Sequence, residues 1–270
     1  GATYAQSAYV PSLITMHGAF TKDSIEVLER IDKPFIVTIS HKQRQFAPQL
    51  NHIATVYNGI DFTNYPFSAK HEGYLLFLGR ISEEKGTHIA IKVAKEANLP
   101  LIIAAKLDTH DVRYYKKYVK PHLGGKIQWI GEVGERERNQ LYAKALCLLH
   151  PVTWPEPFGL TLIEAMACGS PVIAFNKGSI PEVVSHEKTG FVVNNLKEMV
   201  ESVAKIKLIS REECAIHART NFNAERMIAS YESLYSSLLK LLQPEKVYPL
   251  PTSQVSTRIL RSHKAPFLKQ

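Results

Sequence analysis

Cysteine is scarce in this chain of 270 residues, and long apolar runs are missing from it. The three cysteines, Cys147, Cys168 and Cys214, are scattered, so their spacing offers neither a disulfide framework nor a zinc site. Two of them lie in apolar stretches, which predicts buried thiols in a reducing cytoplasm. No apolar run approaches the roughly 20 residues that a membrane-spanning helix needs. A Walker loop, a cluster of metal ligands and a Ser-His-Asp arrangement are also missing from the sequence.

The charge balance is basic, with a formal net charge of +8 at pH 7. Most cations are interspersed with acids, as on a solvated surface, but no acid follows Glu245. Nucleic-acid binding would require aromatic residues interleaved with lysine and arginine, and that pattern does not occur. We therefore expect no nucleic-acid partner, while peripheral contact with an anionic membrane stays open. Residues 244–270 contain several prolines and no periodicity, which predicts a basic, extended tail.

From residue 73 onward, apolar strands alternate with amphipathic helices. Strands are expected at residues 74–78, 101–105, 127–130, 146–149 and 172–175. Helices are expected at residues 87–97, 112–119 and 135–144, and after residues 195 and 224. This alternation predicts an α/β fold, with a parallel sheet covered by helices on both faces. Ligands of such a sheet bind beyond the carboxyl ends of its strands.

The N-terminal part holds a second, shorter set of strands. They are expected at residues 11–17, 34–40 and 53–57, with helices at 23–30 and 41–46. Strands this apolar, with so few helices to cover them, should leave hydrophobic surface exposed. We predict a Rossmann-like remnant with its linker at residues 1–66, a complete Rossmann-like domain with a closing helix at 67–243, and the tail.

The most informative segment runs from Glu156 to Gly169, with the sequence EPFGLTLIEAMACG. Residues 160–168 are predicted to form a helix that Gly169 terminates. Its first turn would present free backbone amides near Gly159, and such amides bind phosphate. Glu156 precedes this anion site and Glu164 lies one to two turns inside the helix. Acidic groups beside a phosphate site suit hydroxyls, so a sugar nucleotide is the ligand we expect.

Two cations follow the first strand of the larger predicted domain. Arg80 and Lys85 belong to the loop GRISEEKG, beyond the carboxyl end of that strand, where they would meet a diphosphate. They would stabilise the charge on a leaving nucleoside diphosphate, a role that other enzymes give to a metal ion. The alternative is that both are solvated cations paired with Glu83 and Glu84.

Together these features resemble the donor site of retaining GT-B glycosyltransferases of group 1, the glycogen-synthase-like glycosyltransferase family 4. The resemblance rests on the E-x7-E spacing, the Phe-Gly-Leu step, the Glu-Ala-Met-Ala-Cys-Gly run and the Gly-Arg…Lys-Gly loop, and extends over residues 14–235. It implies transfer of a sugar from a nucleotide diphosphate sugar to an acceptor hydroxyl, without cofactor or metal ion. UDP-glucose is the first choice of donor, and GDP or ADP stays open because no residue reads the base decisively.

The resemblance also implies roles for individual residues. Glu164 would bind the ribose hydroxyls, and Glu156 would contact the transferred sugar or stabilise positive charge at its anomeric carbon. His17, across the cleft, would contact a donor hydroxyl or a phosphate oxygen. Val133 would pack on the base, although a plain core position is the alternative. Sugar hydroxyls and phosphate oxygens would meet the backbone amides of Phe158, Gly159, Leu160 and Thr161.

Two other polar residues are expected to be structural. Glu182 follows the turn made by Gly178 and Pro181, and His150 precedes a proline at the end of a buried strand. We expect both to serve the fold rather than the reaction.

The resemblance further implies a longer N-terminal domain than this chain contains. We therefore expect a fragment, a processed product or a separately encoded half, which pairs with itself or with another chain through its N-terminal remnant. The main alternative to a complete transferase is a donor-binding module without independent catalysis. A phosphorylase or epimerase with a similar site and a glycosidase fit less well, the last because Arg80 and Lys85 favour a nucleotide leaving group.

Overall fold

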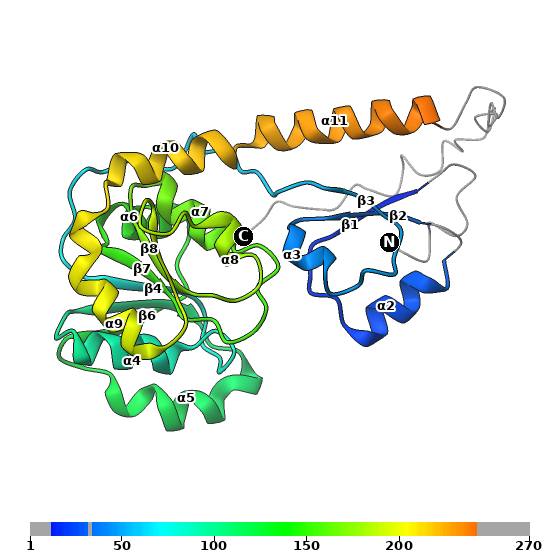
Figure 1. Cartoon of the computed structure of the whole chain (residues 1–270). Coiled ribbons are helices and arrows are strands. Elements are labelled where there is room, and N and C mark those ends of the chain that lie inside the picture. The colour runs from blue at the N-terminus through cyan, green and yellow to red at the C-terminus, as the bar shows by residue number, and fades with distance from the viewer. Residues whose placement is uncertain (1–11, 32–33, 242–270) are drawn as a thin grey trace, which may run out of the picture.

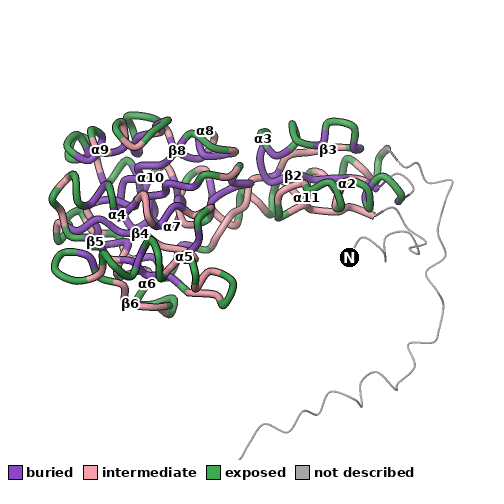
Figure 2. The backbone as a smooth tube through the Cα atoms, turned by 90° about the horizontal axis from the view of Figure 1, so that it is seen from below, coloured by how far each residue is buried: buried purple, intermediate pink, exposed green. Residues whose placement is uncertain are grey.

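The structure, a computed structural model, describes residues 12–31 and 34–241. The expected tail at 244–270 and residue 11, the first of the predicted N-terminal strand, lie outside the described residues. Two parallel sheets form two separate masses, the larger one built from the middle of the chain and the smaller one from its N-terminal part (Figures 1 and 2).

The larger sheet has six parallel strands in the order β6-β5-β4-β7-β8-β9. The strands are β4 (Leu75–Arg80), β5 (Leu101–Lys106), β6 (Ile127–Gly131), β7 (Cys147–His150), β8 (Val172–Phe175) and β9 (Gly190–Val193). The chain builds outward from β4 to β6 and then returns to place β7 against the other side of β4. The strand order therefore reverses between β4 and β7, and a reversal of this kind is where doubly wound sheets bind ligands.

Helices cover both faces of this sheet, as the alternating pattern predicts. On one face α4 packs against α9, and on the other α7 packs against α6 and α10 (Figure 1). These helices are α4 (Thr87–Glu96), α6 (Glu135–Lys144), α7 (Leu160–Ala167), α9 (Leu196–Lys205) and α10 (Arg211–Asn221). Shorter pieces are α5 (Val112–Tyr118), α8 (Ile180–Val183), η1 (Thr109–Asp111), η2 (Lys120–His122) and η3 (Ile206–Leu208). The GT-B-type α/β fold expected from the sequence is confirmed, whereas β9 and α10 were not predicted.

Helix α7 is buried on most of its surface because it lies between the sheet and α10. All residues from Leu162 to Ala167 are buried, which is why the helix is apolar nearly all round rather than striped. Gly169 follows the helix with φ of 88°, and a side chain there would lie 2.8 Å from Ser68 O. This glycine therefore ends the helix in the role that the sequence predicts.

The smaller sheet has three parallel strands, β1 (Leu13–Met16), β2 (Phe35–Thr38) and β3 (His52–Thr55), in that order. The short helices α2 (Lys22–Glu29) and α3 (His41–Arg44) connect them. Helix α11 (Ala224–Leu241) leaves the larger mass and extends along the smaller sheet (Figure 1), where Tyr231 Oη lies 2.8 Å from Thr15 Oγ1. The helix expected to close the larger domain therefore also contacts the N-terminal sheet.

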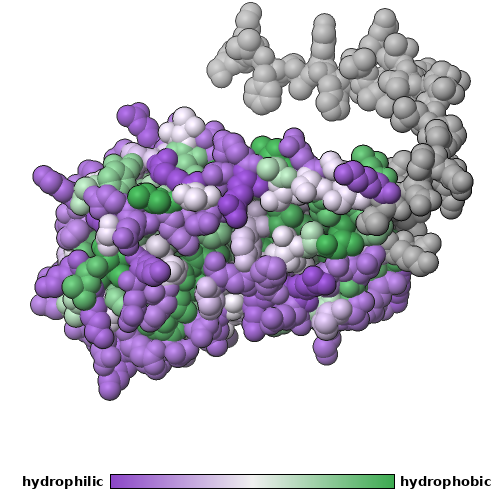
Figure 3. All heavy atoms as spheres, turned by 45° about the horizontal axis from the view of Figure 1, so that its top comes forward, coloured by the Kyte–Doolittle hydropathy of each residue, from purple (hydrophilic) through white to green (hydrophobic). Residues whose placement is uncertain are grey.

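Hydrophobic side chains are exposed on the smaller half, but they lie on helices and after α3, whereas the strands, for which the sequence predicts exposure, are buried or intermediate. On α11, the exposed fractions are 51% for Ile228, 51% for Tyr235 and 76% for Leu239. Val27 of α2 and Phe46 after α3 are also about half exposed. Figure 3 shows apolar patches on this half and on the larger half, among hydrophilic surroundings.

Three observations bear on the cysteines, on metal ions and on membranes. All three cysteines are buried, and burial raises the pKa of the Cys168 and Cys214 thiols to about 12, so they behave as core residues. Within residues 12–31 and 34–241, no group of acidic, histidine or cysteine side chains has the arrangement of a metal site. Within the same ranges, no helix has the length and apolarity needed to cross a bilayer.

Candidate active site

A cavity of ≈ 330 Å³ lies beyond the carboxyl ends of β4 and β7, where the strand order reverses. Gly79 of β4, His150 of β7 and the start of α7 form its walls on the larger half. His17 and Gly18, directly after β1, form its wall on the smaller half. Most of the predicted site residues line it, namely His17, Lys85, Glu156, Phe158, Gly159, Leu160 and Thr161. Arg80, Val133 and Glu164 are not among its lining residues.

The start of α7 faces this cavity because Gly159 turns the chain into it. Gly159 has φ of 86°, and a side chain there would lie 2.8 Å from Leu162 Cδ1, so the turn requires glycine. The amides of Leu160 and Thr161 begin the helix and have no acceptor one turn earlier, whereas Leu162 N already donates to Gly159 O at 3.0 Å. Thr161 Oγ1 is buried and has no hydrogen-bond partner within the described part of the chain. Free donors at this position make a site for an anion.

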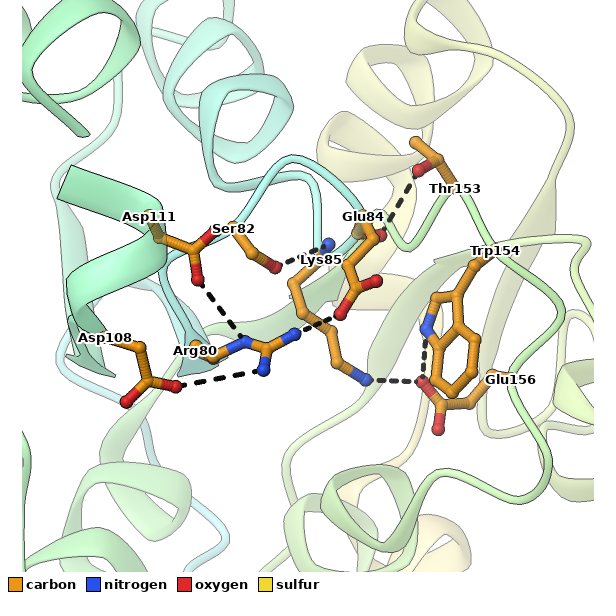
Figure 4. A network of polar contacts seen from close by, with 9 residues as sticks. All are labelled: Arg80, Ser82, Glu84, Lys85, Asp108, Asp111, Thr153, Trp154 and Glu156. Atoms are coloured by element: carbon orange, nitrogen blue, oxygen red, sulfur yellow. Dashed lines mark hydrogen bonds and ion pairs between the residues drawn. The ribbon is translucent and has the colours of Figure 1, made fainter. Parts of the chain in front are cut away.

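Glu156 and Lys85 form an ion pair at the wall of the cavity. Lys85 Nζ lies 2.7 Å from Glu156 Oε2, and Trp154 Nε1 donates to the same oxygen at 3.2 Å (Figure 4). The Lys85 ammonium also lies 4.9 Å from the centre of the Trp154 ring, within the range of a cation–π contact. Trp154 therefore contacts both members of the pair, a role that the sequence analysis did not assign.

The backbone of Glu156 is fixed by the turn after β8. Ser179 donates to Glu156 O through its amide at 2.9 Å and through its hydroxyl at 3.0 Å. Gly178 has φ of 58°, and a side chain there would lie 2.2 Å from the same carbonyl oxygen. The turn-forming role expected for Gly178 thus has a specific purpose, which is close contact with the loop that carries Glu156.

Arg80 lies near the cavity but is paired with acids. Its guanidinium contacts Glu84, and it lies 3.8 Å from an oxygen of Asp108 and 3.6 Å from an oxygen of Asp111 (Figure 4). The pairing with Glu84 is the alternative that the sequence left open. Asp108 and Asp111 come from the segment after β5 and were not anticipated. A diphosphate would have to compete with these three carboxylates for Arg80.

Glu164 is directed into a buried polar network. Its carboxylate accepts hydrogen bonds from Tyr65 Oη at 3.1 Å and Tyr142 Oη at 2.9 Å, and Arg138 Nη2 lies 3.4 Å away. Burial, followed by the charge of Glu164, raises the pKa of both phenols, so they remain donors at neutral pH. A ribose bound by Glu164 would therefore have to share the carboxylate with these partners or replace one of them.

Val133 packs against the hydrophobic core of the larger half. This is the core position that the sequence analysis gave as the alternative to base contact. Its assignment to the base stays a prediction.

His150 is buried, as expected, but it also lines the cavity. Its Nε2 atom lies 3.9 Å from Glu156 Oε2 and has no hydrogen-bond partner within the described ranges. Burial lowers the pKa of His150 to about 4, although the nearby Glu156 carboxylate opposes this shift. The ring is therefore neutral at pH 7 and can donate to or accept from a ligand. Its place at the carboxyl end of β7 was the signal available in the sequence.

His17 is exposed on the opposite wall, and the loop that carries it is held by Gln43. Gln43 Nε2 donates to Met16 O at 2.9 Å and to Gly18 O at 2.7 Å. Gln43 Oε1 accepts from the amide of Ile39 at 2.8 Å. These bonds fix the backbone on both sides of His17.

Glu182 has the structural role expected of it, and it connects the two halves. Its carboxylate accepts from the amides of His41 at 2.8 Å and Lys42 at 2.7 Å, at the start of α3. Tyr57 Oη donates to it at 2.9 Å. The negative charge therefore lies at the amino end of a short helix, where it is stabilised.

The two parallel sheets, with a cavity beyond the carboxyl ends of their strands, have the arrangement of the GT-B fold. A family model described as "Glycosyl transferases group 1" matches residues 63–226, more than half of the chain. The chain therefore belongs to the group 1 glycosyltransferases.

Similar proteins agree with this assignment. An uncharacterized glycosyltransferase of Methanocaldococcus jannaschii is 26% identical over 221 residues, which cover 70% of this chain and 56% of that protein. The glycogen synthase of Mycobacterium tuberculosis is 26% identical over 196 residues, covering 69% of this chain and 47% of the synthase. Anabaena HepE, in complex with UDP and glucose, has a TM-score of 0.75 at 20% identity, with 87% of this chain and 74% of that chain covered. The chain spans about half the length of the curated relatives it matches.

Proposed function

We propose that this chain binds a nucleotide diphosphate sugar, UDP-glucose by preference, and belongs to a retaining glycosyltransferase that transfers the sugar to an acceptor hydroxyl. The observation that carries the proposal is the convergence of the α7 amides, Lys85 and Glu156 on one cavity with His17 opposite. Phosphate favours the amides and the ammonium, whereas hydroxyls favour the carboxylate. One cavity thus offers separate partners for the two ends of a sugar diphosphate.

In the proposed reaction, the bond between the anomeric carbon and the diphosphate oxygen breaks, and its electron pair stays on the diphosphate. The acceptor oxygen forms the new bond to the anomeric carbon on the same face of the sugar. Its proton passes to the leaving diphosphate. Lys85, the start of α7 and Arg80, once Arg80 leaves its acidic partners, stabilise the negative charge of the leaving group without a metal ion. Glu156 stabilises the positive charge at the anomeric carbon, and His17 contacts the sugar or a phosphate oxygen.

The proposed role of Glu164 in binding ribose involves an exchange of hydrogen bonds. With two ribose hydroxyls to accept from and one acceptor position unused, Glu164 gives up a phenol or the Arg138 contact. Tyr65 is the partner we expect to leave, because its bond of 3.1 Å is longer than that of Tyr142 at 2.9 Å.

The alternative is a donor-binding half that needs a second polypeptide for catalysis. The exposed apolar side chains of α11, of α2 and after α3 support it, because such surface commonly marks an interface. A water-excluding cleft needs two complete walls, and the smaller half offers three strands.

Calorimetric titration with UDP, GDP and ADP in the presence of EDTA tests the donor site. We expect UDP to bind without added metal. Binding that appears only with magnesium or manganese would overturn the electrostatic part of the proposal. Sugar transfer by a monodisperse monomer would decide against the half-enzyme alternative.

A further inference from the structure

A second cavity, of ≈ 140 Å³, adjoins the donor cavity. Glu156 and Pro157 line both, so the two cavities share a wall. Its other walls are Ala19, Phe20, Gln43 and Phe46 from the smaller half and Pro155 from the larger half. It is therefore formed between the two halves, next to the carboxylate that faces the donor sugar in the proposed function.

The walls of this cavity are apolar apart from two residues. Gln43 is buried, and both hydrogens of its side-chain amide are donated to backbone oxygens, while its Oε1 already accepts one bond, so it offers no free donor to a polar ligand. Glu156 is the other polar side chain, and it lies at the border with the donor cavity. A sugar ring in this space would leave most of its hydroxyls without partners, which is costly. The lining of the cavity therefore favours an apolar ligand that carries a polar group at the end next to Glu156.

The size and the aromatic walls favour a flat ring. An apolar cavity of about 150 Å³ in another protein binds benzene, so this volume suits one ring of that size. Phe20 contacts the His52 ring edge to face, with 5.9 Å between ring centres. Phe46 is 46% exposed, and a ring in the cavity would cover apolar surface that now faces water.

We propose that this cavity is an acceptor subsite that takes an aryl group and places a hydroxyl attached near that group beside Glu156. The proposal rests on the proposed function, because the cavity is an acceptor position only if the donor sugar lies beside Glu156. The acceptor class is thus a hydroxyl compound with a phenyl-sized apolar ring, rather than an unsubstituted sugar.

The test compares two glucosides that differ only in the group attached to the anomeric oxygen. One is 4-nitrophenyl β-D-glucopyranoside, which carries an aryl group, and the other is methyl β-D-glucopyranoside, which does not. Saturation-transfer NMR with the full chain measures binding, with and without UDP. We expect the aryl glycoside to bind through its ring and the methyl glycoside to bind at least roughly fivefold more weakly, because burying apolar ring surface supplies the difference. Equal binding of the two glycosides would overturn the proposal.

Three variants locate the site. Ala19→Leu fills the cavity and should abolish the preference for the aryl probe, while Phe46→Ala removes one wall and should weaken it. Phe46 is half exposed, so Phe46→Ala should leave the fold intact. It therefore keeps the test possible even if Ala19→Leu does not fold. Phe67→Ala is the matched control, because Phe67 is 44% exposed and lines neither cavity. An aryl preference unchanged in both cavity variants, or lost in the control, would overturn the proposal.

UDP binding in the same samples separates the two claims. If the aryl glycoside binds but UDP does not, the donor site is contradicted, and the cavity can then no longer be called an acceptor subsite. UDP binding with no aryl preference would overturn the subsite and leave the donor site standing.

Discussion

The 2.7 Å ion pair between Lys85 and Glu156 joins two loops that are far apart in sequence. Lys85 lies between β4 and α4, and Glu156 lies between β7 and α7. Because β4 and β7 are neighbours only through the reversal in strand order, the pair spans the position where this fold binds ligands.

Replacing Lys85 with methionine should weaken UDP binding. The change keeps most of the apolar stem and removes the charge, and loss of a charge-assisted hydrogen bond costs about 1.5–3 kcal/mol, so affinity should fall roughly tenfold or more. Calorimetric titration with UDP in the presence of EDTA measures this loss of affinity. Lys92→Met is the control, because Lys92 is exposed on α4 and should leave affinity unchanged. Equal losses in both variants would point to a general charge effect.

Glu164→Gln and Glu156→Gln should separate the two ends of the donor. Glu164→Gln should lower UDP affinity, whereas Glu156→Gln should spare UDP and reduce binding or turnover of the intact sugar nucleotide. Glu164 also accepts from two buried phenols, so its variant should unfold at a lower temperature, and affinities must be measured well below that transition. Wild-type UDP affinity in Glu164→Gln would contradict the ribose assignment.

Trp154 should report on the donor site by fluorescence. The chain has two tryptophans, and Trp129 donates to Ala105 O at 2.8 Å, away from the cavity. UDP should perturb the Lys85 ammonium that lies over the Trp154 ring and so change its emission. The change should vanish in Trp154→Phe and persist in Trp129→Phe. A response carried by Trp129 alone would contradict the placement of the diphosphate beside Lys85.

His150 should make stability depend on pH. An exposed histidine has a pKa near 6.5, and that of His150 is lowered to about 4, so the unfolded state binds the proton first. The contribution of neutral His150 to the free energy of unfolding is fully present above pH 6.5. It is lost as the pH falls toward 4, and its magnitude is roughly 3 kcal/mol. The free energy of unfolding should therefore decline less over this range in His150→Gln. Identical pH profiles for the two proteins would show that His150 does not titrate on unfolding.

Sequence patterns located most of the larger sheet, because its strands are apolar and its helices regular. Helix α10 was missed because its inner face carries Arg211, Cys214 and Ala218 instead of large apolar residues. Arg211 is buried and donates to the backbone oxygens of Ser68, Ala143 and Ala145. No periodicity argument places a buried arginine in a core position, since its partners come from distant parts of the chain.

The candidate site was predictable where its residues follow a strand or begin a helix. His17, Lys85 and Glu156 meet at the cavity because the topology gathers the carboxyl ends of strands. The partners of Arg80 and Glu164 were not predictable, because Asp108, Asp111 and the phenols of Tyr65 and Tyr142 reach them through tertiary packing alone.

The turn after β8 connects the position of Glu156 to the spacing of the two halves. Ser179 binds the backbone of Glu156, and Glu182, three residues later, binds the amides at the start of α3. Separation of the halves would strain the turn that fixes the Glu156 backbone. One short segment of chain thus holds both the backbone of Glu156 at the cavity and the contact between the two halves.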